Sequence, residues 1–213
     1  MTSARIWVAT GNPKKAEELL RILPGGVQVS TILDAPGGAH WSVVEDAPDF
    51  LGNARKKALS AARFLETQGL LDSGDLVLAD DSGLCVEALG GRPGIHSARY
   101  AGDQASDQER IQKLLSELQG VPPQERGADF VCALVAVRQG VPVFETEERC
   151  QGRIAEHPSG SKGFGYDPVF FPLVGGEICP QSFADCSVET KDQLSHRGKA
   201  LRRFAEEYRK LCS

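Results

Sequence analysis

Two adjacent carboxylates, Asp80 and Asp81, follow the apolar residues 77–79 and are the residues most suited to chemistry in this chain. A Ser-Gly pair comes next, and the loop beyond it contains several glycines, a proline and Arg99. Acids at the end of a strand, beside a glycine-rich loop and an arginine, suit metal-assisted chemistry on a phosphate. Neighbouring side chains on a strand point to opposite faces, so both acids reach one site only if the strand has ended. The alternative is a solvated acidic turn.

A second segment, Thr-Gly-Asn-Pro-Lys-Lys at residues 10–15, is typical of a turn between a strand and a helix. Free backbone N–H groups and the positive end of the helix dipole favour an anion at such a turn. The two lysines add positive charge, although the spacing GxxxxGK[ST] of a Walker loop is absent. An ordinary turn with solvated lysines is the alternative. The candidate phosphate-binding residues are Thr10, Gly11, Asn12, Pro13, Lys14 and Lys15.

Two later segments suit recognition of a nucleobase. In Gly-Phe-Gly-Tyr-Asp-Pro, the glycines allow the Phe164 ring to lie flat against a base, and Asp167 can accept base N–H protons. The alternative is that Phe164 fills the core. Near the C-terminus, Ser195 is a suitable N-cap that places His196 and Arg197 in the first turn of a helix. Cations there oppose the helix dipole, a cost that a bound anionic or electron-rich ligand would offset. For His196 alone, a surface histidine is the alternative.

Composition limits the class of protein. The chain has 213 residues, of which 41% are hydrophobic and 25% charged, as expected for a globular α/β domain. A net charge of −5 argues against a broad grip on nucleic acid. No apolar run approaches the roughly 20 residues of a membrane span, and the N-terminus lacks a signal-peptide design, so we expect a cytoplasmic protein. The six cysteines contain no CxxC pair, which excludes a zinc ribbon and makes a disulfide framework improbable.

Hydrophobic periodicity predicts the secondary structure. Strands are expected at residues 5–10, 27–33, 76–79 and 84–88, and a hairpin at 130–138 and 141–150 turning at Gln139-Gly140. Helices are expected at residues 13–23, ended by Gly25-Gly26, and at 49–68, 106–118 and 195–211. Helices alternate with strands before an antiparallel pair, which predicts a single α/β domain over residues 1–213 with a mixed sheet flanked by helices.

The motifs TGNPKK, ADDSGL with GGRPGIHSARYAG, GFGYDPVFF and SHRGKAL, in this order, resemble those of the inosine triphosphate pyrophosphatase family. They extend over residues 10–201, nearly the whole chain. The resemblance implies Mg²⁺-dependent hydrolysis of ITP, dITP and XTP to the monophosphate and pyrophosphate, which removes deaminated purines from the nucleotide pool. It also implies an elongated mixed sheet, two lobes around a central cleft, and a homodimer.

The resemblance also assigns roles to residues. Asp81 corresponds to a catalytic, proton-accepting aspartate that is also a metal ligand. Glu45 is the remaining candidate for the second metal ligand, because Val44 stands where many bacterial relatives have another glutamate. The implied substrate-binding residues beyond residues 10–15 are Ser82, Arg99, Phe164, Gly165, Tyr166, Asp167, Lys191, His196 and Arg197, the last two as a base-recognising pair.

Selectivity is expected at the purine 6-position. Hydrogen-bond donors of His196 or Arg197 would match the 6-oxo group of inosine and meet a donor in the 6-amino group of adenine. Two other functions stay open. One is a pyrophosphatase for modified pyrimidine triphosphates, from which pyrophosphate release from ITP would distinguish this chain. The other is a catalytically silent nucleotide-binding regulator, which would show no magnesium-dependent turnover.

Overall fold

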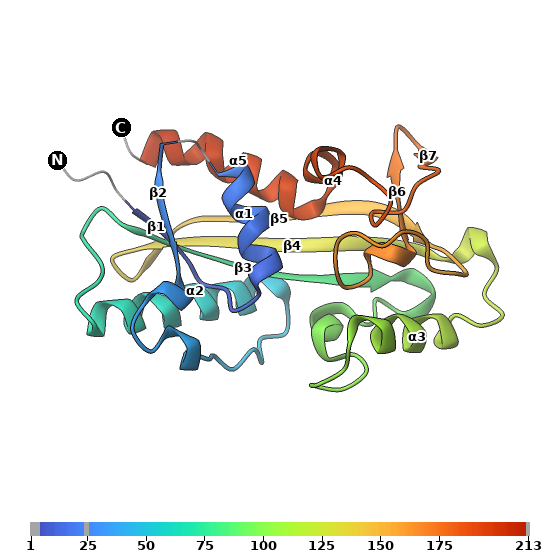
Figure 1. Cartoon of the computed structure of the whole chain (residues 1–213), viewed down its shortest axis with the longest axis horizontal. Helices are drawn as coiled ribbons and strands as arrows, with labels where there is room; N and C mark the ends of the chain where they lie inside the picture. Colours follow the sequence, from blue (N-terminus) through green and yellow to red (C-terminus); the bar gives the residue numbers. More distant parts are fainter. Residues whose placement is uncertain (1–4, 24–25, 212–213) are drawn as a thin grey trace. The chain divides into compact units, whose positions relative to one another are not determined.

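The computed structural model describes residues 5–23 and 26–211 as an α/β fold around a seven-stranded sheet (Figure 1). The strands are β1 (Arg5–Val8), β2 (Gln28–Thr31), β3 (Leu76–Val86), β4 (Gly127–Arg138), β5 (Val141–Ile154), β6 (Phe170–Val174) and β7 (Glu177–Ile178). Their order in the sheet is β2-β1-β3-β4-β5-β6-β7. β1 pairs in parallel with β2 and β3, whereas β6 is antiparallel to β5 and β7. The predicted α/β class and mixed sheet are confirmed; one domain over residues 1–213 stays a prediction.

The helices are α1 (Pro13–Ile22), α2 (Phe50–Thr67), α3 (Asp107–Glu117), α4 (Val188–Leu194) and α5 (His196–Leu211). Four of the five match the predicted ranges to within a few residues. Asn12, Ser106 and the predicted cap Ser195 each accept a backbone N–H bond at the start of a helix. The sequence analysis missed α4 and expected no helix before residue 195 in this region. Leu194 ends α4.

β3 is where the prediction was wrong. We expected a turn at Asp80 and Asp81, but one strand runs unbroken from Leu76 to Val86. Each buried carboxylate is neutralised by a lysine: Asp80 Oδ2 lies 2.9 Å from Lys15 Nζ on α1, and Asp81 Oδ1 lies 2.9 Å from Lys57 Nζ on α2. Because side chains alternate along a strand, the two acids point to opposite faces of the sheet, each toward its own helix.

The chain forms two compact units. Unit 1 contains the described residues of 1–81, 132–147 and 200–213. In this unit α1 and α5 cover one face of the strands, where Leu19 and Phe204 join a core with Ile6 and Leu78 (Figure 1). α2 covers the other face with a stripe of small buried residues, Ala54, Ala58, Ala61 and Ala62. Small side chains let the helix lie close to the strands, which brings its polar residues within reach of β3.

Unit 2 contains residues 82–131 and 148–199 and has a core of its own. Its centre is aromatic: the Phe130 ring lies 4.5 Å from the Phe170 ring and 6.1 Å from the Phe183 ring, between centroids. α3 adds Ile111 and Leu114 to the same core. Residues that follow α4 and β5 therefore pack against an aromatic core.

The predicted hairpin is confirmed. Gln139 and Gly140 join β4 to β5 with φ angles of 50° and 73°. Two successive left-handed residues are the geometry of a type I′ turn, whose twist matches that of the strands it connects. Gly140 adopts this conformation at little cost, whereas Gln139 is the non-glycine residue that carries strain among the described residues.

Five of the six cysteines lie among the described residues. Cys132, Cys150 and Cys186 are buried, and Cys85 and Cys179 are half-buried. Cys212 and Gly25 lie outside the described residues. None of the helices within residues 5–23 and 26–211 combines the length and the apolar character that crossing a membrane requires.

Replacing Phe204 by alanine tests the core of unit 1. Phe204 is fully buried and contacts the rings of Phe144 and Tyr208 at 5.5 and 5.9 Å. We expect Phe204→Ala to lower the free energy of unfolding by about 3–5 kcal/mol, measured by urea denaturation. The control Leu20→Ala, at a residue that is 47% exposed, should cost well under half as much. Equal losses would contradict this packing.

Candidate active site

Glu45 and Asp81, the two predicted metal ligands, meet at one lysine in unit 1. Lys57 Nζ lies 2.7 Å from Glu45 Oε2 and 2.9 Å from Asp81 Oδ1. The same ammonium donates to the backbone oxygen of Asp80 at 3.3 Å. We call Glu45, Lys57 and Asp81 the carboxylate cluster. The structure thus brings together two acids that are 36 residues apart in the sequence.

Lys57 is a site residue that the sequence analysis did not assign. A lysine on a buried helix face was the available signal, because a buried ammonium needs a partner. Burial disfavours its charged form, but the carboxylates of Asp81, Asp80 and Glu45 outweigh burial and raise the pKa of Lys57. The lysine is therefore a fixed cation within the cluster.

The donor set fits magnesium. No group of three or more His, Cys, Asp or Glu residues suited to a metal occurs among the residues that the structure describes. Magnesium, however, is commonly held by one or two carboxylates together with substrate phosphates and water. Glu45 and Asp81 supply two carboxylates that already point at one cation. The cluster suits an ion that arrives with a polyphosphate rather than one bound by protein alone.

The predicted phosphate-binding turn is also in unit 1, but three of its backbone N–H groups are bonded within the turn. Asn12 Oδ1 accepts the N–H of Lys14 at 3.0 Å and that of Lys15 at 3.4 Å. Thr10 Oγ1 accepts the N–H of Asn12 at 3.1 Å. Pro13 begins α1 as predicted. The expectation of free backbone donors is therefore wrong for Asn12, Lys14 and Lys15, and the two lysine side chains bring positive charge to this turn.

The predicted base-binding residues form a second group, in unit 2. The Phe164 ring is half-buried, with Lys191 Nζ 4.8 Å and the Arg197 guanidinium carbon 5.6 Å from its centroid. Asp167 Oδ2 accepts from Phe164 N and from Lys191 Nζ, both at 2.8 Å. We call Phe164, Asp167, Lys191, His196 and Arg197 the aromatic cluster. Because Phe164 is only half-buried, the alternative that it fills the core is wrong.

His196 lies on the aromatic core of unit 2. It begins α5 as predicted, is only 5% exposed, and its ring stacks on Phe130 at 4.8 Å with 10° between the planes. The alternative of a surface histidine is therefore wrong. Arg197 beside it is buried as well, and it faces the electron-rich Phe164 ring. The attraction between the guanidinium and the aromatic ring thus partly offsets the unfavourable position of this cation at the start of a helix.

The remaining predicted residues have diverse surroundings. Tyr166 is buried in the core of unit 2, and its hydroxyl donates to Ser97 O at 3.0 Å. Gly165 donates its N–H to Asp107 Oδ2 at 2.8 Å. Arg99 is exposed and donates from Nε to His96 Nδ1 at 3.2 Å, whereas Ser82 is half-buried on β3. Their contact with substrate stays a prediction.

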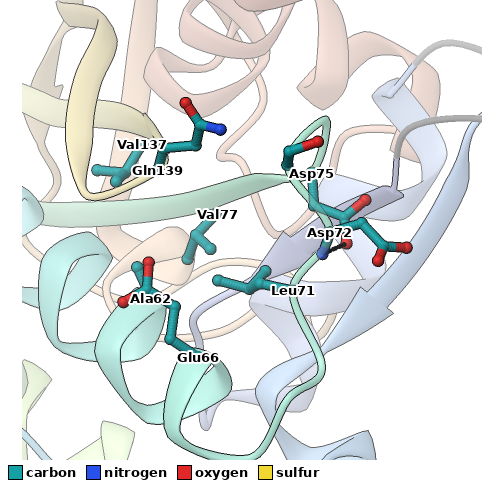
Figure 2. A pocket seen from close by; sticks show the side chains of 9 residues that line it. Ala62, Glu66, Leu71, Asp72, Asp75, Val77, Val137 and Gln139 are labelled. Carbon is teal, nitrogen blue, oxygen red and sulfur yellow. Dashed lines mark hydrogen bonds between the residues drawn. The ribbon is translucent and has the colours of Figure 1, made fainter.

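Unit 1 also has a pocket of about 230 Å³, which none of these residues lines. Figure 2 shows the side chains around it. Its walls come from α2, the start of β3 and the end of β4, with Glu66, Val77 and Val137 among the lining residues. Val77 is four residues before Asp81 on β3. The pocket therefore shares elements with the carboxylate cluster and none of its side chains.

Comparison with known proteins places this arrangement in a family. A sequence profile described as "Ham1 family" matches residues 6–207. The chain belongs to the Ham1 family. A protein of Geobacillus kaustophilus named "dITP/XTP pyrophosphatase" is 44% identical over 207 residues, covering 97% of this chain and 95% of the relative. One of Shouchella clausii with the same name is 43% identical over 199 residues, 93% of each chain. These matches confirm the family resemblance predicted from the motifs.

The fold is shared with solved Ham1 proteins. The "Structure of a HAM1 protein from Coxiella burnetii" has a TM-score of 0.79 and 31% sequence identity. The match covers 97% of this chain and 99% of the Coxiella chain. The sheet and helices described above are therefore the common Ham1 architecture.

Two glycine substitutions test the geometry of the aromatic cluster. A Cβ at Gly163 would lie 2.2 Å from Asp167 Oδ2, whereas a Cβ at Gly165 would meet no atom within 4 Å; both residues have left-handed φ angles. We expect Gly165→Ala to cost about 1–2 kcal/mol of stability through backbone strain alone. Gly163→Ala should cost at least about 2 kcal/mol more, because it also displaces a hydrogen-bonded carboxylate. Urea denaturation measures both, and equal losses would contradict the contact.

Proposed function

We propose that this Ham1 protein is a nucleoside triphosphate pyrophosphatase that hydrolyses ITP, dITP and XTP to the monophosphate and pyrophosphate. The observation that carries the proposal is the convergence of Glu45 and Asp81 on Lys57, a cationic and acidic arrangement suited to a polyphosphate. The name "dITP/XTP pyrophosphatase" of relatives above 40% identity supports the substrate class.

The carboxylate cluster acts on the triphosphate in this proposal. Asp81 accepts a proton from the attacking water, whose oxygen forms the new bond to the α-phosphorus as the bond to the bridging oxygen of pyrophosphate breaks. Lys14 and Lys15 at the start of α1 stabilise the negative charge on the departing pyrophosphate. A Cβ at Gly11 would meet no atom within 4 Å, so the chain there leaves room for a phosphate.

Glu45 and Asp81 would hold Mg²⁺. When bound, the ion supplies charge neutralisation and orientation of the phosphate oxygens. The two acids and Lys57 together carry a formal charge of −2 + 1 = −1, so the cluster retains affinity for a further cation. The choice of Mg²⁺ over other divalent ions rests on oxygen-only ligands and a polyphosphate substrate.

The aromatic cluster selects the base in this proposal. The Phe164 ring offers a stacking face, and His196 and Arg197 offer donors to a 6-oxo group, which adenine lacks. Tyr166 supports this loop from the core through its bond to Ser97. A homodimer of single-domain chains in the cytoplasm completes the proposal, on the strength of the family resemblance.

A substrate panel tests the function. We expect pyrophosphate release from ITP, dITP and XTP in the presence of Mg²⁺, at least 100-fold slower release from ATP, and none after chelation with EDTA. Ion chromatography of the products separates pyrophosphate from phosphate. Equal rates with ATP and ITP would refute the base assignment, preference for a modified pyrimidine triphosphate would support that alternative, and nucleotide binding without turnover would indicate a regulator.

Asp81→Asn tests the catalytic assignment. The amide keeps the shape of the carboxylate but cannot accept the proton, so we expect kcat for ITP to fall by about 10²–10⁴-fold. Isothermal titration should show nucleotide binding within a few-fold of wild type, because the aromatic cluster is intact. Unchanged kcat would exclude Asp81 as the proton acceptor.

A further inference from the structure

Asn53 is a buried amide that bonds to both segments that carry the acids of the carboxylate cluster, the residues before α2 and β3. It lies on α2 and is 1% exposed. Its Oδ1 accepts the backbone N–H of Ala47 at 3.0 Å, and its Nδ2 donates to Asp81 Oδ2 at 3.2 Å. One side chain thus joins the segment before α2 to the acid in the middle of β3.

The direction of this amide follows from chemistry. The N–H of Ala47 can only donate, so the oxygen of Asn53 must face it and the NH₂ group must face Asp81. Lys57, one helical turn further along α2, donates to the other oxygen of Asp81. Both oxygens of the carboxylate therefore receive a donor from the same helix, which fixes the plane of the carboxylate.

The contacts close a ring. Asn53 binds Ala47, which is two residues from Glu45; Glu45 binds Lys57, and Lys57 and Asn53 both bind Asp81. Holding Ala47 therefore limits where Glu45 can lie, while holding Asp81 limits its rotation. The separation between the two acids is set by α2 rather than by a flexible loop.

We propose that Asn53 is a positioning residue for the reaction: its amide orients Asp81 and, through Ala47, sets the place of Glu45. This inference rests on the proposed pyrophosphatase function. A partner that orients a ligand or base affects its performance by about 10–100-fold. The amide group is required, and not merely a side chain of this size, because only a donor can face Asp81.

Asn53→Asp separates orientation of Asp81 from anchoring of the loop. The new carboxylate has the same shape and can still accept the N–H of Ala47, but it faces Asp81 with an acceptor instead of a donor. We expect kcat for ITP to fall 10–100-fold while KM changes less than about threefold, because the aromatic cluster is untouched. The matched control is Gln68→Glu, the same amide-to-acid change at the C-cap of α2, where Gln68 binds Pro36 O; its kcat should equal wild type.

The double variant Asn53→Asp with Asp81→Asn, called the exchange variant, tests the contact through thermal stability and needs no substrate. Asn53→Asp alone should lower the thermal midpoint, because two buried carboxylates face each other. Combining it with Asp81→Asn restores every hydrogen bond with the amide and the acid exchanged, so we expect most of the midpoint to return while activity stays lost. Recovery of stability without recovery of kcat shows that the direct contact exists and that its polarity matters.

The outcomes are distinct. Turnover by the Asn53→Asp variant within twofold of wild type would overturn the inference and leave the proposed function standing. Absence of ITP hydrolysis by wild type would overturn the function and the inference together. If Asn53→Asp were too unstable to assay, a folded exchange variant would support the contact with Asp81. If neither variant folded, the exchange would have failed to restore the contact with Asp81, and the inference would be wrong.

Discussion

The structure of unit 1 depends on the neutralisation of two carboxylates inside a strand. Asp80 and Asp81 are 3% and 6% exposed in the middle of β3, where an unpaired charge would be very costly. Because they face opposite sides of the sheet, each forms its ion pair with a lysine on its own side. Lys15 on α1 answers the first, and Lys57 on α2 answers the second. The charges on the strand therefore determine which side chains the helices on each face must present.

The groups around the two aspartates differ in their formal net charge. Asp80 and Lys15 together carry no formal net charge, and their ion pair links β3 to α1. Asp81 shares Lys57 with Glu45, so the group on the other face keeps a net negative charge. Removing one member of a buried pair costs far more than a surface pair would, since it leaves its partner uncompensated. The same arrangement therefore serves both the stability of the fold and the proposed binding of a cation with its phosphates.

Local signals in the sequence predicted much of the fold. The cap Ser195 and the Gln139-Gly140 turn act on residues next to them, and both were placed as the structure has them. The sequence Asp-Asp-Ser-Gly looks like a turn by composition, yet β3 continues, because partners 65 and 24 residues away neutralise its acids. Lys57 and Asn53 were missed for the same reason. Their roles come from contacts across the unit, which periodicity along one helix does not reveal.

The two clusters share one device despite their different surroundings. In unit 1, Asp81 receives a neutral N–H donor from Asn53 and the ammonium of Lys57; in unit 2, Asp167 receives the N–H of Phe164 and the ammonium of Lys191. In both, a buried acid is fixed by one neutral and one charged donor, and the lysine comes from a helix. Deleting either acid would strand a buried lysine, so loss of activity after such a change would mix lost chemistry with local unfolding. Amide isosteres leave a hydrogen-bond acceptor for each lysine, and they are for that reason the substitutions that report on chemistry at these two positions.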